Sequence, residues 1–142
     1  MTTIAYRDGV LASDSLVTLG DTKSHGTYIK IKRIGNLLVG AAGGVADSEQ
    51  FLQWLKYDDG ETPPPKGQYS ALVIDPRGRV REIENGSVLP VPRGAKFHAI
   101  GSGGPFALAA MYAGASAVEA VKIATKIDIN SGLPVRKLKL KG

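Results

Sequence analysis

Residues 2–15 of the chain read Thr2-Thr3-Ile4-Ala5-Tyr6-Arg7-Asp8-Gly9-Val10-Leu11-Ala12-Ser13-Asp14-Ser15. Two short, largely apolar runs, 3–6 and 10–13, flank Arg7-Asp8-Gly9. An Asp-Gly pair between two such runs is a strong local signal for a tight β-hairpin turn. The stretch therefore predicts an antiparallel hairpin with Thr2 at its start and Asp14 just past its end.

Outward from this hairpin, alternating or apolar runs predict strands. We expect them at 28–34, 37–42, 70–74, 80–83, 96–100 and 135–140, while 18–23 reads as a polar loop. Asp75-Pro76-Arg77-Gly78 has the composition of a turn between two of these strands. Pro63-Pro64-Pro65 is predicted to be a short, stiff connector.

Three helices complete the pattern. The first is expected at 46–57, with an apolar stripe of Phe51, Leu52 and Leu55 and an end at Asp58-Asp59-Gly60; the second is expected at 106–112. Ser116 and Glu119 have the spacing of a capping box at the start of the third. The stripe predicted for this third helix is Ala117, Ala120, Val121, Ala124 and Ile127. Strands, one helix, strands, two helices and a strand predict an α+β fold.

Length and composition favour one domain over residues 1–142, with 43% hydrophobic and 22% charged residues. The absence of cysteine excludes disulfides and thiolate chemistry, and fits a cytoplasmic protein. No apolar run or leader-like segment suggests a membrane. Without Arg136, Lys137, Lys139 and Lys141, the formal net charge falls from +5 to +1. We interpret these residues as a solvated edge strand, with phosphate binding by them as an alternative, and expect no nucleic-acid partner.

Thr2 is a candidate nucleophile. Removal of Met1 would join a hydroxyl and a free α-amine in one residue, and the amine has a reference pKa of about 7.7–8.0. Such an amine can accept the hydroxyl proton directly or through a water molecule. The ordinary interpretation of a second-position threonine is an exposed residue of no special role.

Three further positions supply what this nucleophile needs. A cation at Lys30 would favour the alkoxide, and Asp14 could hold that cation. The backbone N–H of Gly43, in Gly43-Gly44 before the first helix, could meet a developing oxyanion. The alternative interpretations are an exposed strand residue for Lys30 and a turn carboxylate for Asp14. For Gly43-Gly44 they are an ordinary glycine turn or a phosphate loop.

Ser102, Asp128 and Ser131 follow the later glycine turn and the last helix. Ser102 could be a helix-entry residue or a supporting donor, and Asp128 and Ser131 could belong to a solvated turn. The spacing around Ser102 does not match a nucleophile elbow, because Gly101 directly precedes it. His25 and His98 lie far apart without nearby carboxylates, so we expect neither metal nor cofactor.

Taken together, these segments resemble the β-type subunits of the proteasome, and most closely HslV. The resemblance rests on five segments in the family's order, spanning nearly the whole chain: Thr2-Thr3-Ile4, Ala12-Ser13-Asp14-Ser15, Ile29-Lys30-Ile31, Ala42-Gly43-Gly44-Val45-Ala46-Asp47 and Ile100-Gly101-Ser102-Gly103-Gly104-Pro105. Leu19-Gly20-Asp21-Thr22 resembles a further HslV segment, and Asp128 and Ser131 fall where the family carries an Asp and a Ser.

The resemblance implies an N-terminal-nucleophile (Ntn) hydrolase fold of two antiparallel sheets flanked by helices. It implies a threonine peptidase that acts through an acyl-enzyme, with Thr2 as nucleophile and base. Lys30 would favour the alkoxide form of Thr2, and Asp14 would hold Lys30 in place. The Gly43 N–H would form the oxyanion hole. Ser102, Asp128 and Ser131 would support the amine. A specificity pocket of modest apolar preference would be lined by Val17, Ala41 and Val45.

The chain departs from the family in one helical layer. The family carries two long helices after the glycine turn, and this chain has one short helix followed by residues 60–68. We expect a homo-oligomer, as a ring or stacked assembly, acting on polypeptides, with an ATP-dependent unfoldase as a candidate partner. The alternatives are a silent scaffold of the same fold, favoured if Met1 is retained, and an amidase that acts on a small molecule.

Overall fold

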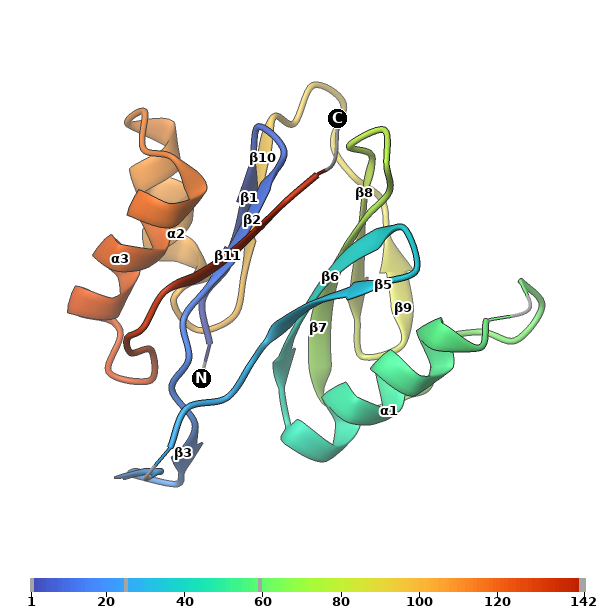
Figure 1. The fold of residues 1–142 in the computed structure, drawn as a ribbon, viewed down its shortest axis with the longest axis horizontal. Coiled ribbons are helices and arrows are strands. Elements are labelled where there is room, and N and C mark those ends of the chain that lie inside the picture. The colour runs from blue at the N-terminus through green and yellow to red at the C-terminus, as the bar shows by residue number, and fades with distance from the viewer. Residues whose placement is uncertain (1, 25, 59, 141–142) are drawn as a thin grey trace.

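The computed structural model describes residues 2–24, 26–58 and 60–140. The expectations for Met1, His25, Asp59 and Lys141 lie outside these residues. Two antiparallel sheets pack face to face, and helices cover their outer faces (Figure 1). The predicted α+β sandwich of two antiparallel sheets flanked by helices is confirmed, while a single domain over 1–142 stays a prediction.

The first sheet is built on the opening hairpin. Its strand order is β10-β1-β2-β11, and all three pairings are antiparallel. The strands are β1 (Ile4–Arg7), β2 (Val10–Ser13), β10 (Phe97–Ile100) and β11 (Arg136–Lys139). Asp8 and Gly9 have φ of 50° and 79°, so both turn residues adopt the left-handed conformation that two-residue hairpins favour. The predicted hairpin is confirmed.

The second sheet has the order β5-β6-β7-β8-β9 and is also antiparallel. Its strands are β5 (Ile31–Ile34), β6 (Leu37–Gly43), β7 (Tyr69–Ile74), β8 (Val80–Glu84) and β9 (Ser87–Leu89). β5 begins three residues later than predicted, and β9 was not predicted. The turn before β9 contains Asn85 and Gly86, both at positive φ.

The segment predicted as a polar loop forms a two-stranded hairpin instead, so that prediction is wrong. β3 (Thr18–Leu19) and β4 (Thr22–Lys23) pair antiparallel. Gly20, with a φ of 59°, makes the turn between them. Leu19, Thr22 and Lys23 are all exposed, so the segment lacks the alternation between a buried and a solvated face that marks a strand in a sequence.

The helices occupy the two outer faces. α1 (Val45–Lys56) lies against the second sheet, whereas α2 (Gly104–Tyr112) and α3 (Ala117–Ile127) lie against the first (Figure 1). Both bonds of the predicted capping box are present: Glu119 N donates to Ser116 Oγ, and Ser116 N donates to Glu119 Oε1. The predicted burial of Ile127 is wrong. This last residue of α3 is 55% exposed because the chain turns away after it.

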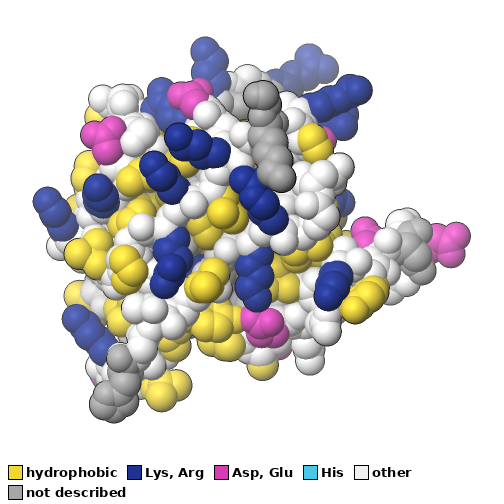
Figure 2. Space-filling model, viewed as in Figure 1, with side chains coloured by type: hydrophobic (Ala, Val, Ile, Leu, Met, Phe, Trp, Pro, Cys, Tyr) yellow, Lys and Arg dark blue, Asp and Glu magenta, His cyan; other side chains and the backbone are white. Residues whose placement is uncertain are grey.

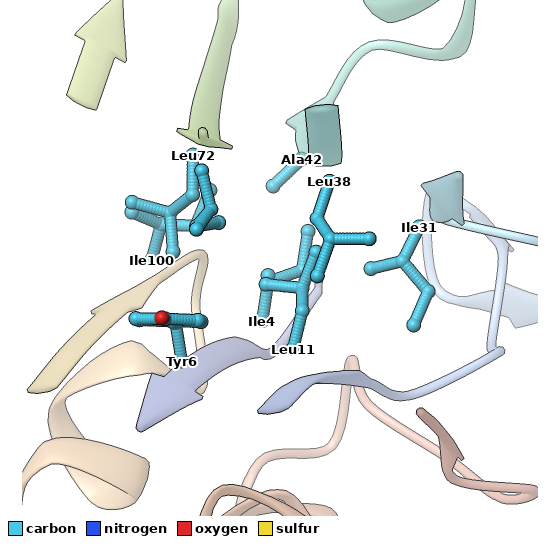
Figure 3. Packing of buried hydrophobic residues seen from close by; sticks show 9 residues of the cluster. Ile4, Tyr6, Leu11, Ile31, Leu38, Ala42, Leu72 and Ile100 are labelled. Carbon is cyan, nitrogen blue, oxygen red and sulfur yellow. The ribbon is translucent and has the colours of Figure 1, made fainter. Parts of the chain in front are cut away.

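Three apolar clusters form the core. The central one lies between the sheets, where Ile4, Leu11, Leu38 and Leu72 are fully buried (Figure 3). A Cβ at Gly40 would lie 2.8 Å from Cγ2 of Ile4, so glycine lets the two sheets approach closely there. The other two clusters join α2 and α3 to the first sheet and α1 to the second.

The segment after α1 supplements the single helix on the second sheet. Trp54 Nε1 donates to the backbone O of Thr62 at 3.1 Å, and Tyr69 Oη donates to that of Pro65 at 2.7 Å. These bonds tie the predicted proline connector to both α1 and the end of the sheet. This outer layer therefore consists of one helix and a hydrogen-bonded connector, which agrees with the prediction that one helical layer is reduced.

Basic side chains spread over the face that carries β5 and β11 (Figure 2). β11 lies at the edge of its sheet, with Lys137 and Lys139 exposed and Leu138 and Leu140 packed against the central cluster. The predicted edge strand is confirmed for Lys137 and Lys139, whereas Arg136 is half-buried. Among the described residues, none of the helices is both long enough and apolar enough to span a bilayer.

Candidate active site

Thr2 lies two residues before the start of β1, with Thr3 between them, and is firmly held. Its side chain and backbone are only 3% exposed. The backbone O of Thr2 accepts a hydrogen bond from Gly103 N at 3.1 Å, and Thr2 N donates to Ser102 Oγ at 3.1 Å. A Cβ at Gly101 would lie 2.1 Å from the backbone O of Thr2. The residue is therefore fixed against the turn before α2 and does not fray.

A buried ion pair stands beside Thr2. Lys30 Nζ donates to Asp14 Oδ1 at 2.9 Å, and the two side chains are 4% and 0% exposed. The second oxygen of Asp14 accepts from Leu16 N at 3.1 Å and from Gly132 N at 3.0 Å. Because both carboxylate oxygens are bonded, Asp14 is held in one orientation. The predicted pairing of Asp14 with Lys30 is present.

Burial dominates the electrostatics of Lys30. Desolvation lowers the pKa of its ammonium group, and the charge and hydrogen bond of Asp14 only partly oppose this. The more distant charge of Asp128 acts in the same direction as Asp14. Lys30 lines the same cavity as Thr2.

The three residues predicted to support the amine form one network. Asp128 Oδ2 accepts from Ser102 Oγ at 2.7 Å and from Ser131 Oγ at 2.6 Å. Burial raises the pKa of Asp128, but the bonds from Ser131, Ser102 and the backbone N of Asn130 outweigh it, and the net pKa is lowered. Asp128 is therefore an ionised acceptor at neutral pH. Through Ser102 the network reaches the nitrogen of Thr2.

Gly43 ends β6 in a conformation that requires glycine. Its φ is +116°, and a Cβ would lie 2.5 Å from the backbone O of Gln68. The following residue, Gly44, is the N-cap of α1 and donates its N–H to the same oxygen at 3.0 Å. Gly43 lines both cavities that border Thr2. The oxyanion role stays a prediction, while the position beside Thr2 fits it.

Two cavities flank Thr2. The first, of about 250 Å³, includes all three predicted pocket residues, Val17, Ala41 and Val45, together with Lys30. Its walls are mainly apolar. The second, of about 260 Å³, is lined by polar groups that include Gln68, Asn85 and Ser102. Thr2 thus lies where an extended ligand could reach both spaces.

The sequence did not single out Tyr28 and Ser48, which also line the first cavity. The Tyr28 hydroxyl donates to Glu49 of α1. Burial, and then this bond, raises the pKa of Tyr28 to about 12. The alternation at 28–34 was the only signal there, and it predicts a face of a strand rather than a cavity wall.

Thr3 was also missed. Its side chain is fully buried, and Thr3 Oγ1 lies 2.7 Å from Ser131 Oγ. No local pattern marks a second threonine as special, since its partner is 128 residues away. Among the described residues, no group of three or more His, Asp or Glu side chains could hold a metal ion. His98 lies on β10 opposite Tyr6, and burial lowers its pKa.

No family model matches the sequence. The fold is similar to BPH of Thiobacillus denitrificans in complex with epoxomicin, with 24% identity over 99% of both chains and a TM-score of 0.68. It is similar to eukaryotic HslV from Trypanosoma brucei, with 25% identity over 97% of this chain and 98% of that chain and a TM-score of 0.73. The chain therefore has the fold of these HslV and proteasome-type proteins.

Proposed function

We propose that this protein is a threonine peptidase, which hydrolyses peptide bonds through an acyl-enzyme on Thr2 once Met1 has been removed. The observation that carries the proposal is the position of Thr2. It is buried between two cavities, shares one with Lys30, and bonds through its nitrogen to the Ser102–Asp128 network. Fold neighbours that are HslV and proteasome-type proteins support the same reaction class.

In the proposed reaction, the hydroxyl oxygen of Thr2 attacks the carbonyl carbon of the scissile bond. The proton of that hydroxyl passes to the freed α-amine, and the N–H of Gly43 stabilises the negative oxygen. The C–N bond then breaks, and the leaving nitrogen takes the proton. A water molecule attacks the ester, which releases the second product and restores the Thr2 hydroxyl.

Lys30 and Asp128 have different parts in this scheme. The positive charge of Lys30 favours the alkoxide of Thr2, while Asp14 keeps the lysine in place. Ser102, Asp128 and Ser131 hold the amine in the direction of the hydroxyl. The apolar walls formed by Val17, Ala41 and Val45 favour an uncharged side chain of modest size before the scissile bond.

We further propose that the peptidase works as a homo-oligomer in the cytoplasm. Large apolar side chains are exposed on α2 and α3, among them Tyr112 at 78% and Ile127 at 55%. A second copy covering these helices would bury them. An ATP-dependent unfoldase remains a candidate partner. Light scattering of the purified protein tests the assembly, and a monomer would favour the small-molecule amidase instead.

The chemistry is tested by mass spectrometry and peptide hydrolysis. Intact mass reports whether Met1 is removed; its retention would favour the scaffold. The BPH complex suggests epoxomicin as the probe, which should add one equivalent to Thr2 in this chain. Thr2→Ala should abolish both labelling and hydrolysis, whereas Thr2→Ser keeps a hydroxyl and should keep part of the activity. Hydrolysis that persists in Thr2→Ala would refute the proposal.

A further inference from the structure

Thr3 bonds directly to Asp14 and, through Ser131, to Asp128. Its backbone N donates to Asp14 Oδ1 at 3.0 Å, the same oxygen that receives Lys30 Nζ. Its backbone O accepts from Asp14 N at 3.1 Å. Its hydroxyl contacts Ser131, which donates to Asp128. One residue therefore joins the Lys30–Asp14 pair to the Asp128 network.

The direction of the Thr3–Ser131 bond follows from the number of protons. Asp128 is ionised and only accepts, and the single hydroxyl proton of Ser131 points to its Oδ2 at 2.6 Å. Ser131 Oγ can then only accept from Thr3, so the Thr3 hydroxyl is the donor at 2.7 Å. The same reasoning makes Ser102 the acceptor for Thr2 N, since its own proton goes to Asp128.

These hydrogen bonds form a circuit that the peptide bond between Thr2 and Thr3 closes. It runs from the Thr3 hydroxyl through Ser131 to Asp128, and from Asp128 back through Ser102 to the nitrogen of Thr2. Within each branch one bond polarises the next, and both branches donate to Oδ2 of Asp128, so a change in one branch alters the charge that the other receives. The circuit is tightly enclosed: a Cβ at Gly103 would lie 1.8 Å from Thr3 Oγ1 and 3.2 Å from Asp128 Oδ2.

We propose that Thr3 is a positioning residue of this site, whose hydroxyl orients Ser131 and Asp128 and thereby the nitrogen of Thr2. The inference deepens the proposed function and rests on it in one respect, that the Thr2 nitrogen serves as the base. The geometric part, in which the Thr3 hydroxyl orients Asp128 through Ser131, does not depend on any reaction.

The test compares three substitutions. Thr3→Val keeps the shape and the backbone bonds to Asp14 but removes the hydroxyl, and Thr3→Ser restores it. Ser13→Ala is the matched control, because Ser13 is also fully buried but its Oγ has no hydrogen-bond partner within the described part of the chain. In protein freed of Met1, we expect Thr3→Val to lower kcat about fivefold, the equivalent of one net hydrogen bond, with little change in KM. Thr3→Ser and Ser13→Ala should stay within about twofold, since they lose no such bond.

A second readout does not depend on hydrolysis. The pKa of the Asp128 carboxyl, followed by carbon NMR in a Thr2→Ala background, should rise in Thr3→Val, because the carboxylate loses the support of its polarised donor. It should not move in Ser13→Ala. An unchanged Asp128 pKa in folded Thr3→Val would overturn the inference, whether or not the protein cleaves peptides. Failure of hydrolysis in the unmodified protein, with the pKa shift present, would overturn only the proposed function.

A measurement on the unmodified chain covers the case in which Thr3→Val does not fold. A hydroxyl proton held in a buried bond exchanges slowly with water, so the Thr3 hydroxyl should give an observable NMR signal. That signal should shift as Asp128 is protonated at low pH. A Thr3 hydroxyl signal that is insensitive to this protonation would contradict the circuit.

Discussion

Lys30 Nζ and Asp14 Oδ1 are 2.9 Å apart, and both side chains are almost completely removed from solvent. The carboxylate is satisfied from every side by Lys30 and by backbone N–H groups. A buried ion pair gains little over apolar packing, but removing one partner leaves an uncompensated charge. Removing either partner should therefore be costly for stability.

Asp14→Asn tests this relationship. We expect it to reduce the free energy of unfolding by about 3 kcal/mol, because the ammonium group of Lys30 stays buried without its counter-charge. Urea denaturation at neutral pH measures the change. The double variant Asp14→Asn/Lys30→Met should recover part of the loss. A double variant that is less stable than Asp14→Asn would contradict the assignment of the cost to the unpaired lysine.

Asp128 should make stability depend on pH in the acid range. Its pKa in the folded protein is below the reference value of 3.8, so its contribution is fully present above that value. The contribution is lost as the pH falls through the lowered pKa, because the folded state then has to bind the proton. The stability gap between the unmodified protein and Asp128→Asn should thus narrow below about pH 4. Urea unfolding at several acidic pH values checks this, and a gap that widens on acidification would disprove it.

Gly101→Ala should damage the site more than its backbone conformation alone explains. Gly101 has a φ of +92°, and an added Cβ would lie 2.1 Å from the backbone O of Thr2. Gly94 is the control, since it has a φ of +77° and nothing within 4 Å of such a Cβ. We expect Gly94→Ala to cost about 1 kcal/mol and Gly101→Ala at least about 2 kcal/mol more. Equal losses in thermal or urea unfolding would show that the contact with Thr2 relaxes freely.

Val45→Phe should narrow the first cavity and shift cleavage toward smaller residues before the scissile bond. Val45 lines that cavity and is 45% exposed, so a larger ring can be accommodated without strain in the core. Val88→Phe is a control of similar exposure on β9, outside both cavities beside Thr2. The ratio of kcat/KM for leucine and alanine substrates should fall only in Val45→Phe. The same fall in both variants would show that the first cavity does not determine the preference for the residue before the scissile bond.

Features encoded by neighbouring residues were predictable from the sequence. The turn at Asp8-Gly9 and the capping box of Ser116 and Glu119 need only local backbone chemistry, and both are present. β9 and the β3–β4 hairpin were missed because exposed or very short strands lack a clear alternation. Ile127 was misplaced because helical periodicity does not show where the chain leaves the packed face.

The same contrast between local and long-range features applies to the candidate site. Asp14, Lys30 and Gly43 could be proposed because each residue type suits a distinct part of one reaction. The contribution of Thr3 could not, since it depends on Ser131 and on the space above Gly103, both more than 95 positions away. Long-range contacts of this kind have no signature in a single sequence.

The circuit between Thr2 and Thr3 also sets an order of events during synthesis. Thr2 and Thr3 are synthesised well before Ser102, Asp128 and Ser131. β1 cannot pair with β10, nor β2 with β11, until that late segment is available. A nascent chain therefore carries Thr2 before the groups that bond to its nitrogen, and the site proposed to cleave peptides is complete only after this region is translated.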